Sequence, residues 1–117
     1  MKNFQANNSN PQNSIKILGQ SAQGYIGQCD CCDHFNFVYG NVLFIFTLQG
    51  LRNFHEVLED KLDMHHLSEP LPNGKDHLLP SPIPNFMLAF NSHELKDISH
   101  IFQETFLAIE IEKLISS

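Results

Sequence analysis

One stretch of the sequence decides the fold, and it reads Phe35-Asn36-Phe37-Val38-Tyr39-Gly40-Asn41-Val42-Leu43-Phe44-Ile45-Phe46. Before Gly40, aromatic residues recur at every second position, which is the period of a β-strand. Gly40-Asn41 predicts a two-residue hairpin turn, with glycine where the turn needs a positive φ. The facing pairs are then Tyr39 with Val42, Phe37 with Phe44, and Phe35 with Phe46. All three pairs share one face of the predicted hairpin.

An alternative interpretation runs a single strand straight through Gly40. The hairpin is favoured because aromatic cross-strand pairs contribute roughly 0.2–1 kcal/mol each. Its opposite face carries Val38, Leu43 and Ile45. We therefore expect the hairpin to be central in its sheet and covered on both faces.

Two short strands are predicted before the hairpin. Ile15–Leu18 and Tyr25–Gln28 flank a turn at residues 21–24, and they read as an antiparallel pair. Residues 1–13 are polar and rich in asparagine, so they bury too little surface to offset the entropy of ordering. We expect a disordered polar tail over 1–13 and a single α+β domain over 14–117.

Two helices are predicted after the hairpin. The first spans about residues 48–63, with Thr47 as its N-cap and an apolar stripe through Leu51, Phe54, Leu58 and Leu62. The second spans about residues 92–115, and Asn91 with Glu94 form a start that resembles a capping box. Between them lies a proline-rich segment, in which Leu78-Leu79 is expected as an edge strand ended by Pro80 and residues 86–90 as a buried strand.

The predicted fold class is therefore α+β, an antiparallel sheet of about four to six strands with two helices packed on it. The 117 residues suffice for one core, and the formal charge of −6 with only seven basic residues disfavours nucleic-acid binding. The longest apolar run is too short for a membrane span, and no signal peptide is recognised at the N-terminus. Three cysteines are an odd number for a disulfide framework. We expect a cytoplasmic protein.

The cysteines form the most chemically specific motif. Cys29 and Cys32 have the C-x-x-C spacing of a zinc knuckle, and His34 is a candidate third metal ligand. A remaining ligand would have to come from elsewhere, such as His55, His65 or His66. If residues 29–32 continued a regular strand, the two thiols would point to opposite faces and could not chelate. An inert cysteine turn is the simpler alternative.

Thiol redox chemistry is a further use of the same motif. Redox C-x-x-C pairs usually lie at a helix N-terminus, where the helix dipole lowers the thiol pKa. Here the following residues read as a strand, and Asp30 and Asp33 flank the thiols. Their negative charge raises a thiol pKa and disfavours this role.

The histidines give no clear constellation. His65, His66 and His77 lie in or near the proline-rich segment, where solvated side chains are expected more often than ligands. His55 borders the apolar stripe of the first helix and is expected at the edge of the core. His93 and His100 are expected to be solvated.

The second helix carries more apolar surface than one sheet covers. Beyond its main stripe it has Ile101, Leu107, Ile111, Leu114 and Ile115. Contiguous exposed apolar patches are often interfaces, so we expect a homodimer through this C-terminal helix or docking of a partner. The alternative is that the proline-rich segment folds over the excess. With no catalytic constellation recognised, the predicted function is a non-enzymatic interaction or ligand-binding module, with zinc binding by Cys29, Cys32 and His34 as the alternative.

Part of the sequence resembles a known family. Its motifs are Gly24-Tyr25-Ile26, the Cys29-x-x-Cys32 pair, Phe37-x-Tyr39-Gly40-Asn41-Val42 and the helix start at Asn91-Ser92-x-Glu94-Leu95. They are similar to those of small uncharacterised bacterial single-domain proteins, over about residues 20–60 and 86–110. This family is known only as a domain of unknown function. The resemblance implies a standalone intracellular domain, and no activity, cofactor or catalytic residue. Cys31 and the asparagine-rich tail depart from the pattern.

Overall fold

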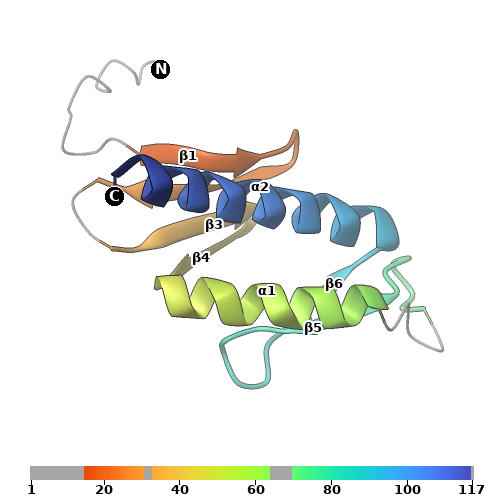
Figure 1. The fold of residues 1–117 in the computed structure, drawn as a ribbon. Coiled ribbons are helices and arrows are strands. Elements are labelled where there is room, and N and C mark those ends of the chain that lie inside the picture. The colour runs from red at the N-terminus through yellow and green to blue at the C-terminus, as the bar shows by residue number, and fades with distance from the viewer. Residues whose placement is uncertain (1–14, 31–32, 64–69, 117) are drawn as a thin grey trace, which may run out of the picture.

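The computed structural model describes residues 15–30, 33–63 and 70–116, which form strands and helices in the order β-β-β-β-α-β-β-α (Figure 1). The elements are β1 (Ile15–Gln20), β2 (Gly24–Cys29), β3 (Phe35–Tyr39), β4 (Val42–Phe46), α1 (Leu48–Asp63), β5 (His77–Pro80), β6 (Met87–Phe90) and α2 (Ser92–Ser116). The α+β class is confirmed. The polar tail predicted over residues 1–13 lies outside the described residues.

The first four strands form an antiparallel meander in the order β1-β2-β3-β4. Its central hairpin has the predicted register, with Tyr39 opposite Val42 and Phe37 opposite Phe44. Gly40 has a φ of 57°, as the first central residue of this turn requires. The hairpin prediction is therefore confirmed, and the single strand through Gly40 is wrong.

The starts of both helices are capped as the sequence indicates. Thr47 Oγ1 accepts a hydrogen bond from the Gly50 N–H at 3.0 Å. At α2 the capping box is complete, because Asn91 Oδ1 accepts from the Glu94 N–H at 2.8 Å and Glu94 Oε1 accepts from the Asn91 N–H at 3.0 Å. These bonds satisfy donors that a helix start otherwise leaves unpaired.

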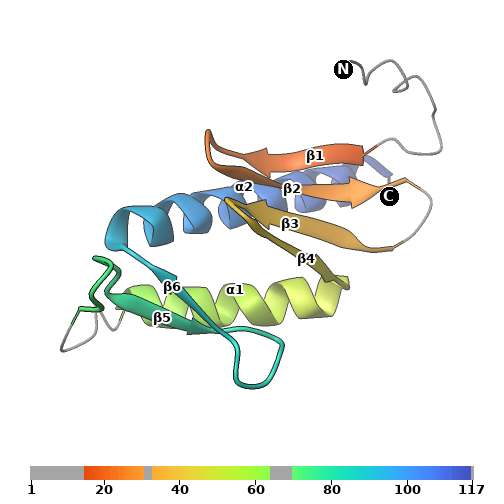
Figure 2. The same cartoon turned by 180° about the vertical axis from the view of Figure 1, so that it is seen from behind.

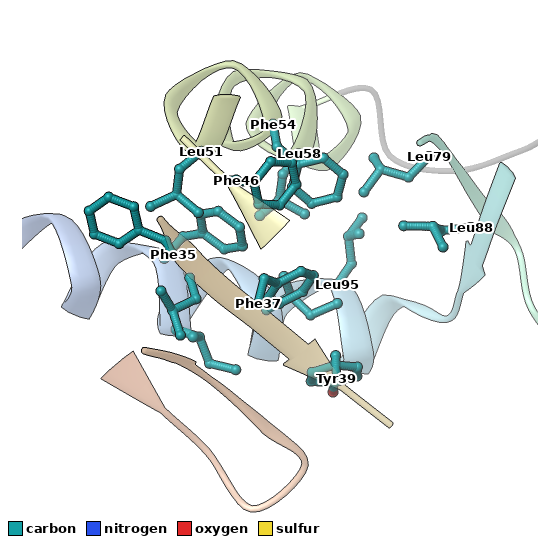
Figure 3. Close-up of a cluster of buried hydrophobic side chains, with 14 of the residues drawn as sticks. Phe35, Phe37, Tyr39, Phe46, Leu51, Phe54, Leu58, Leu79, Leu88 and Leu95 are labelled. Atoms are coloured by element: carbon teal, nitrogen blue, oxygen red, sulfur yellow. The ribbon is translucent and has the colours of Figure 1, made fainter. Parts of the chain in front are cut away.

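The core lies between the sheet and the two helices, which pack side by side on its inner face (Figures 1 and 2). Phe37 of β3 is fully buried, and its ring centroid lies 5.8 Å from that of Phe54 in α1 and 5.2 Å from that of Phe102 in α2. Figure 3 shows Phe35 and Phe37 of β3 on the side of the strand where Leu51 and Leu58 of α1 lie. The aromatic residues of the hairpin thus join both helices to the sheet.

A second, two-stranded sheet is formed by β5 and β6. It packs against α1, and Leu79 and Leu88 point into the common core (Figures 2 and 3). The described part of the proline-rich segment therefore supports α1. The alternative in which this segment covers the excess apolar face of α2 is wrong for residues 70–84.

One expectation about the meander is also wrong. We expected the central hairpin to be covered on both faces, but β4 is an edge strand, and Leu43 and Ile45 are 56% and 63% exposed. The reason is architectural. Both helices lie on the same face of the sheet, so no described element covers the other face.

Candidate functional site

The predicted metal site lies at the connection between β2 and β3. Cys29 is the last residue of β2, and its backbone N–H donates to the carbonyl oxygen of His34 at 3.3 Å. Gln28 pairs with Phe35 at the end of the ladder, so Cys29 and His34 occupy the next cross-strand position. The fold thus brings two of the three predicted ligands together.

The third predicted ligand, Cys32, lies outside the described residues. Within the part of the chain that is described, no three His, Cys, Asp or Glu side chains are grouped to hold a metal ion. The connection joins two strands, so Cys29 ends a strand and is not placed at a helix N-terminus, the position that activates redox thiols.

The histidines are dispersed. His93 and His100 are exposed, as expected, while His65 and His66 fall outside the described residues. The expectation of a solvated His77 is wrong, since this residue is 5% exposed and its Nδ1 lies 2.8 Å from Asp76 Oδ1. His77 is buried because it alternates with Leu79 along β5, and both face inward.

A polar cluster joins the two helices. The ring of His55 stacks on Phe102 with the planes 3° apart, which confirms its place at the core edge. Ser99, 4% exposed, donates to Glu59 Oε2 at 2.6 Å, and His55 Nε2 lies 3.2 Å from the same oxygen. Because the carboxylate stands between the histidine and the hydroxyl, the histidine cannot act as base toward this serine. The cluster therefore links α1 to α2 through the Ser99–Glu59 hydrogen bond and the His55–Phe102 contact.

Sequence reasoning missed this cluster. No pattern in the sequence singles out Glu59, yet its carboxylate accepts from Ser99 on the neighbouring helix. The available signal was Ser99 itself, a polar residue next to Ile98 and four positions after Leu95 in the apolar stripe.

Asp97 of α2 accepts hydrogen bonds from two residues of the meander. Its Oδ2 accepts from Tyr39 Oη at 2.9 Å and from Ser21 Oγ at 2.8 Å. Burial, together with the hydrogen bond to the Asp97 carboxylate, raises the pKa of the Tyr39 phenol well above its usual value. The phenol stays protonated at neutral pH, so this group acts as a hydrogen-bond donor in a structural tether.

The C-terminal part of α2 presents an apolar surface next to β1. We call it the α2 tail surface, and it consists of Leu107, Ile111, Leu114 and Ile115, which are 61%, 47%, 76% and 78% exposed. Leu107 and Ile111 also line an open cavity of about 320 Å³ against Ile17 of β1. An ion pair between Lys16 and Glu112 lies at its rim.

A second cavity of about 320 Å³ lies at the other edge of the meander, and we call it the β4–α1 pocket. Its walls come from the end of β4, the first half of α1 and the end of β5, and the residues are Phe46, Gly50, Asn53, Phe54, Val57, Pro80, Ser81 and Pro82. None of these side chains is charged. The pocket is therefore an uncharged cavity next to an open strand edge.

Among the described residues, neither helix has the length and apolar character that a membrane span requires. The sequence model of a family described as "Family of unknown function (DUF6686)" matches residues 12–115. No curated protein matches the chain. No solved structure matches it either.

Proposed function

We propose a non-enzymatic role for this chain, which belongs to the family of unknown function DUF6686: it is an interaction module that self-associates through the α2 tail surface. The observation that carries the proposal is the exposure of four large aliphatic side chains on consecutive turns of one helix. Leu107, Ile111, Leu114 and Ile115 follow a spacing of i, i+4, i+7 and i+8, which places them on one stripe. Single exposed leucines are ordinary, but a contiguous stripe is typical of an interface.

The burial that this surface offers is large enough for a dimer. The four exposed fractions together amount to about two and a half whole aliphatic side chains, and full burial of one such side chain contributes roughly 1.5–3 kcal/mol. Two copies burying their stripes against each other would gain roughly 8–16 kcal/mol, against an association cost of about 4–15 kcal/mol. These magnitudes support a dimer of modest affinity.

A second copy of this chain fits the surface better than a strongly charged partner. The rim carries both signs of charge, with Lys16 and Lys113 beside Glu110 and Glu112. A twofold arrangement places the same patch on both sides of an interface, so each copy meets both a cation and an anion. Ile17 of β1 borders the same surface and extends the apolar area.

Sedimentation velocity tests this proposal. The unmodified chain is expected to shift from monomer to dimer across micromolar to millimolar concentrations, while Leu114→Glu stays monomeric because it places a charge in the contact. His93→Glu adds the same charge at an exposed position on the opposite end of α2 and should dimerise like the unmodified chain. A strict monomer at all concentrations, or equal dimerisation of Leu114→Glu, would overturn the proposal.

A second candidate function is zinc-type metal binding by Cys29, Cys32 and His34. It is supported by the backbone hydrogen bond from the Cys29 N–H to the His34 carbonyl oxygen, which brings these two residues close in the β2–β3 connection. Zinc content by elemental analysis, after purification without chelators, is the test. Zinc near one per chain that is lost in Cys29→Ser and His34→Ala supports it, and zinc far below one per chain refutes it.

The reactivity of the Cys29 thiol tests the third prediction, a thiol redox protein. A redox role requires Cys29 to react with iodoacetamide much faster at neutral pH than an ordinary thiol. If Cys29 reacts with iodoacetamide at the rate of an ordinary thiol, the redox role is refuted.

A further inference from the structure

The β4–α1 pocket lies beside an open edge of the meander. β4 has β3 as its only sheet neighbour among the described strands. Beyond the cavity, β5 and β6 form a separate two-stranded sheet that packs against α1 (Figure 2). The cavity is bounded by Phe46 at the end of β4 and by Pro80 at the end of β5, with Gly50, Phe54 and Val57 of α1 as its floor.

The backbone of β4 has free hydrogen-bonding groups on this side. The bonds from Gly40 N to Gln23 O and from Cys29 N to His34 O show which residues of β3 and its flanks form backbone hydrogen bonds with β2. They are the even-numbered ones. Hydrogen-bonded pairs alternate along an antiparallel ladder, so the backbone groups of Phe35, Phe37 and Tyr39 form their hydrogen bonds with β4. Leu43 and Ile45 then direct their N–H and C=O groups to the open edge.

A strand added at this edge would reach the pocket with its side chains. Side chains alternate between the two faces of a sheet, and in β4 Phe44 and Phe46 point inward while Leu43 and Ile45 point outward. An added strand in register has every second side chain on the inner face, next to Phe46. That position is where the cavity is.

Nothing along β4 protects its edge against such pairing. Val42–Phe46 contains no charged residue, proline or glycine, which are the usual protections. The opposite edge strand, β1, is protected by Lys16 and by a register irregularity between Ile17 and Gly19. The two edges of the meander therefore differ, and only β4 combines an unprotected backbone with a cavity.

The charges select the chemistry of the occupant. The pocket lining and β4 are uncharged, so an inserted side chain must be apolar, because burying an unpaired charge is costly. Over its whole length α1 carries the acidic residues Glu56, Glu59, Asp60 and Asp63 against Arg52 and Lys61, and the chain as a whole has a formal charge of −6, so basic ends on a bound segment are attracted to the protein. A segment with an apolar centre and basic ends complements this distribution.

We propose that the open edge of β4 binds an extended peptide segment by strand addition, with an apolar side chain in the β4–α1 pocket and a basic residue at its end. Main-chain hydrogen bonds to Leu43 and Ile45 give affinity, and the pocket selects the side chain. This site is separate from the α2 tail surface.

The probe is a capped synthetic peptide in which valine and leucine alternate with threonine and a lysine closes each end. Titration into the isotopically labelled full chain should shift the amide resonances of Leu43, Ile45 and Gly50 in a saturable manner. The same peptide with N-methylated backbone at alternate residues keeps its side chains but loses donors, so its binding should be at least fivefold weaker. Glutamates in place of the terminal lysines should also weaken binding.

Two variants at one residue separate the backbone from the side chain. Ile45→Pro removes the outward N–H without breaking the β3–β4 ladder, and Ile45→Thr keeps that N–H while removing the apolar side chain. Ile45→Pro should raise the Kd about fivefold or more, the equivalent of one backbone hydrogen bond of about 1 kcal/mol. Ile45→Thr should bind within about twofold of the unmodified chain. Gly50→Leu, which fills the cavity floor, should abolish the shift at Gly50's neighbours.

Several results would overturn the proposal. Equal binding of the N-methylated peptide or of Ile45→Pro would show that no strand is added. Saturable shifts with toluene but none with the peptide would assign the pocket to a small apolar molecule. Dissociation of a dimer by Ile45→Pro would assign the edge to a second copy. Thermal unfolding of each variant confirms that the fold is retained, and Ile45→Thr keeps the test interpretable if Ile45→Pro does not fold.

Discussion

Gly19 and Gly50 should respond in opposite directions to the same substitution. At Gly19 of β1 an added Cβ would overlap the backbone carbonyl oxygen of Ile101 and lie 2.6 Å from Thr105 Oγ1 in α2. At Gly50 of α1 the nearest atoms would be the movable Phe46 side chain at 3.3 Å and Thr47 Oγ1 at 3.4 Å. Backbone cannot move aside as a side-chain tip can, so only Gly19→Ala forces α2 away from the sheet.

The magnitudes follow from the two sites. Overpacking of a well-packed contact costs about 1–3 kcal/mol, and reduced freedom of the unfolded chain returns about 0.4–1 kcal/mol for any glycine-to-alanine change. Gly19→Ala should therefore destabilise the protein by about 1–2 kcal/mol. Gly50→Ala should stabilise it by about 0.5–1 kcal/mol, since alanine is the better residue inside a helix.

Urea unfolding followed by circular dichroism measures both free energies, and thermal unfolding should show Tm shifts of about 4 °C per kcal/mol. The m-value should stay constant, which shows that the change lies in stability. If Gly19→Ala were as stable as the unmodified chain, α2 would not contact β1 at Gly19, and the packing of the whole layer would have to be reconsidered.

Three further predictions concern local hydrogen bonds. Thr47→Ala removes the cap that accepts from Gly50 and should cost about 1 kcal/mol of unfolding free energy, whereas Thr47→Ser should cost less. Tyr39→Phe leaves Asp97 with one hydroxyl donor fewer and should cost about 1–2 kcal/mol in the same assay, with Tyr25→Phe as the control that keeps this bond. For Glu94, burial opposes the charged form, but hydrogen bonds from Lys75 and the Asn91 backbone outweigh it and hold the pKa below the ordinary 4.5. Because this pKa is depressed, Glu94 contributes stability above about pH 4.5, and that contribution is lost as pH falls through the folded-state pKa. Glu94→Gln should therefore be less stable than the unmodified chain at pH 7, and the difference in unfolding free energy should shrink in acid. A difference that stays constant with pH would contradict the assignment.

The elements that could be predicted from the sequence are those governed by local rules. The alternation around Gly40, the Thr47 cap and the Asn91–Glu94 capping box each involve residues close in sequence, and each is found in the structure. The coverage of Leu43 and Ile45 could not be predicted, since it depends on which face the helices occupy. Periodicity identifies an apolar face but does not say what lies against it.

The candidate sites divide in the same way. The C-x-x-C spacing predicted that Cys29 and Cys32 converge on a metal with His34 as a third ligand, and of this set the structure describes Cys29 and His34, whose backbones are hydrogen-bonded across the β2–β3 connection. The burial of His77 and the contact from Ser99 to Glu59 depend on partners far apart in sequence. The β4–α1 pocket likewise has walls from three elements, so no single stretch of sequence indicates it.

The order of the elements along the chain has a consequence for synthesis on the ribosome. The meander consists of consecutive hairpins, and each strand pairs only with its neighbours in sequence, so the sheet can form soon after it emerges. Its aromatic face is covered in large part by α2, which follows the meander, α1 and the β5–β6 hairpin in the chain. During that interval Phe37 and Ile26 are not yet buried by α2, and the nascent chain exposes a hydrophobic surface of the kind that chaperones bind. Slower translation before Ser92 should then lower the yield of folded protein.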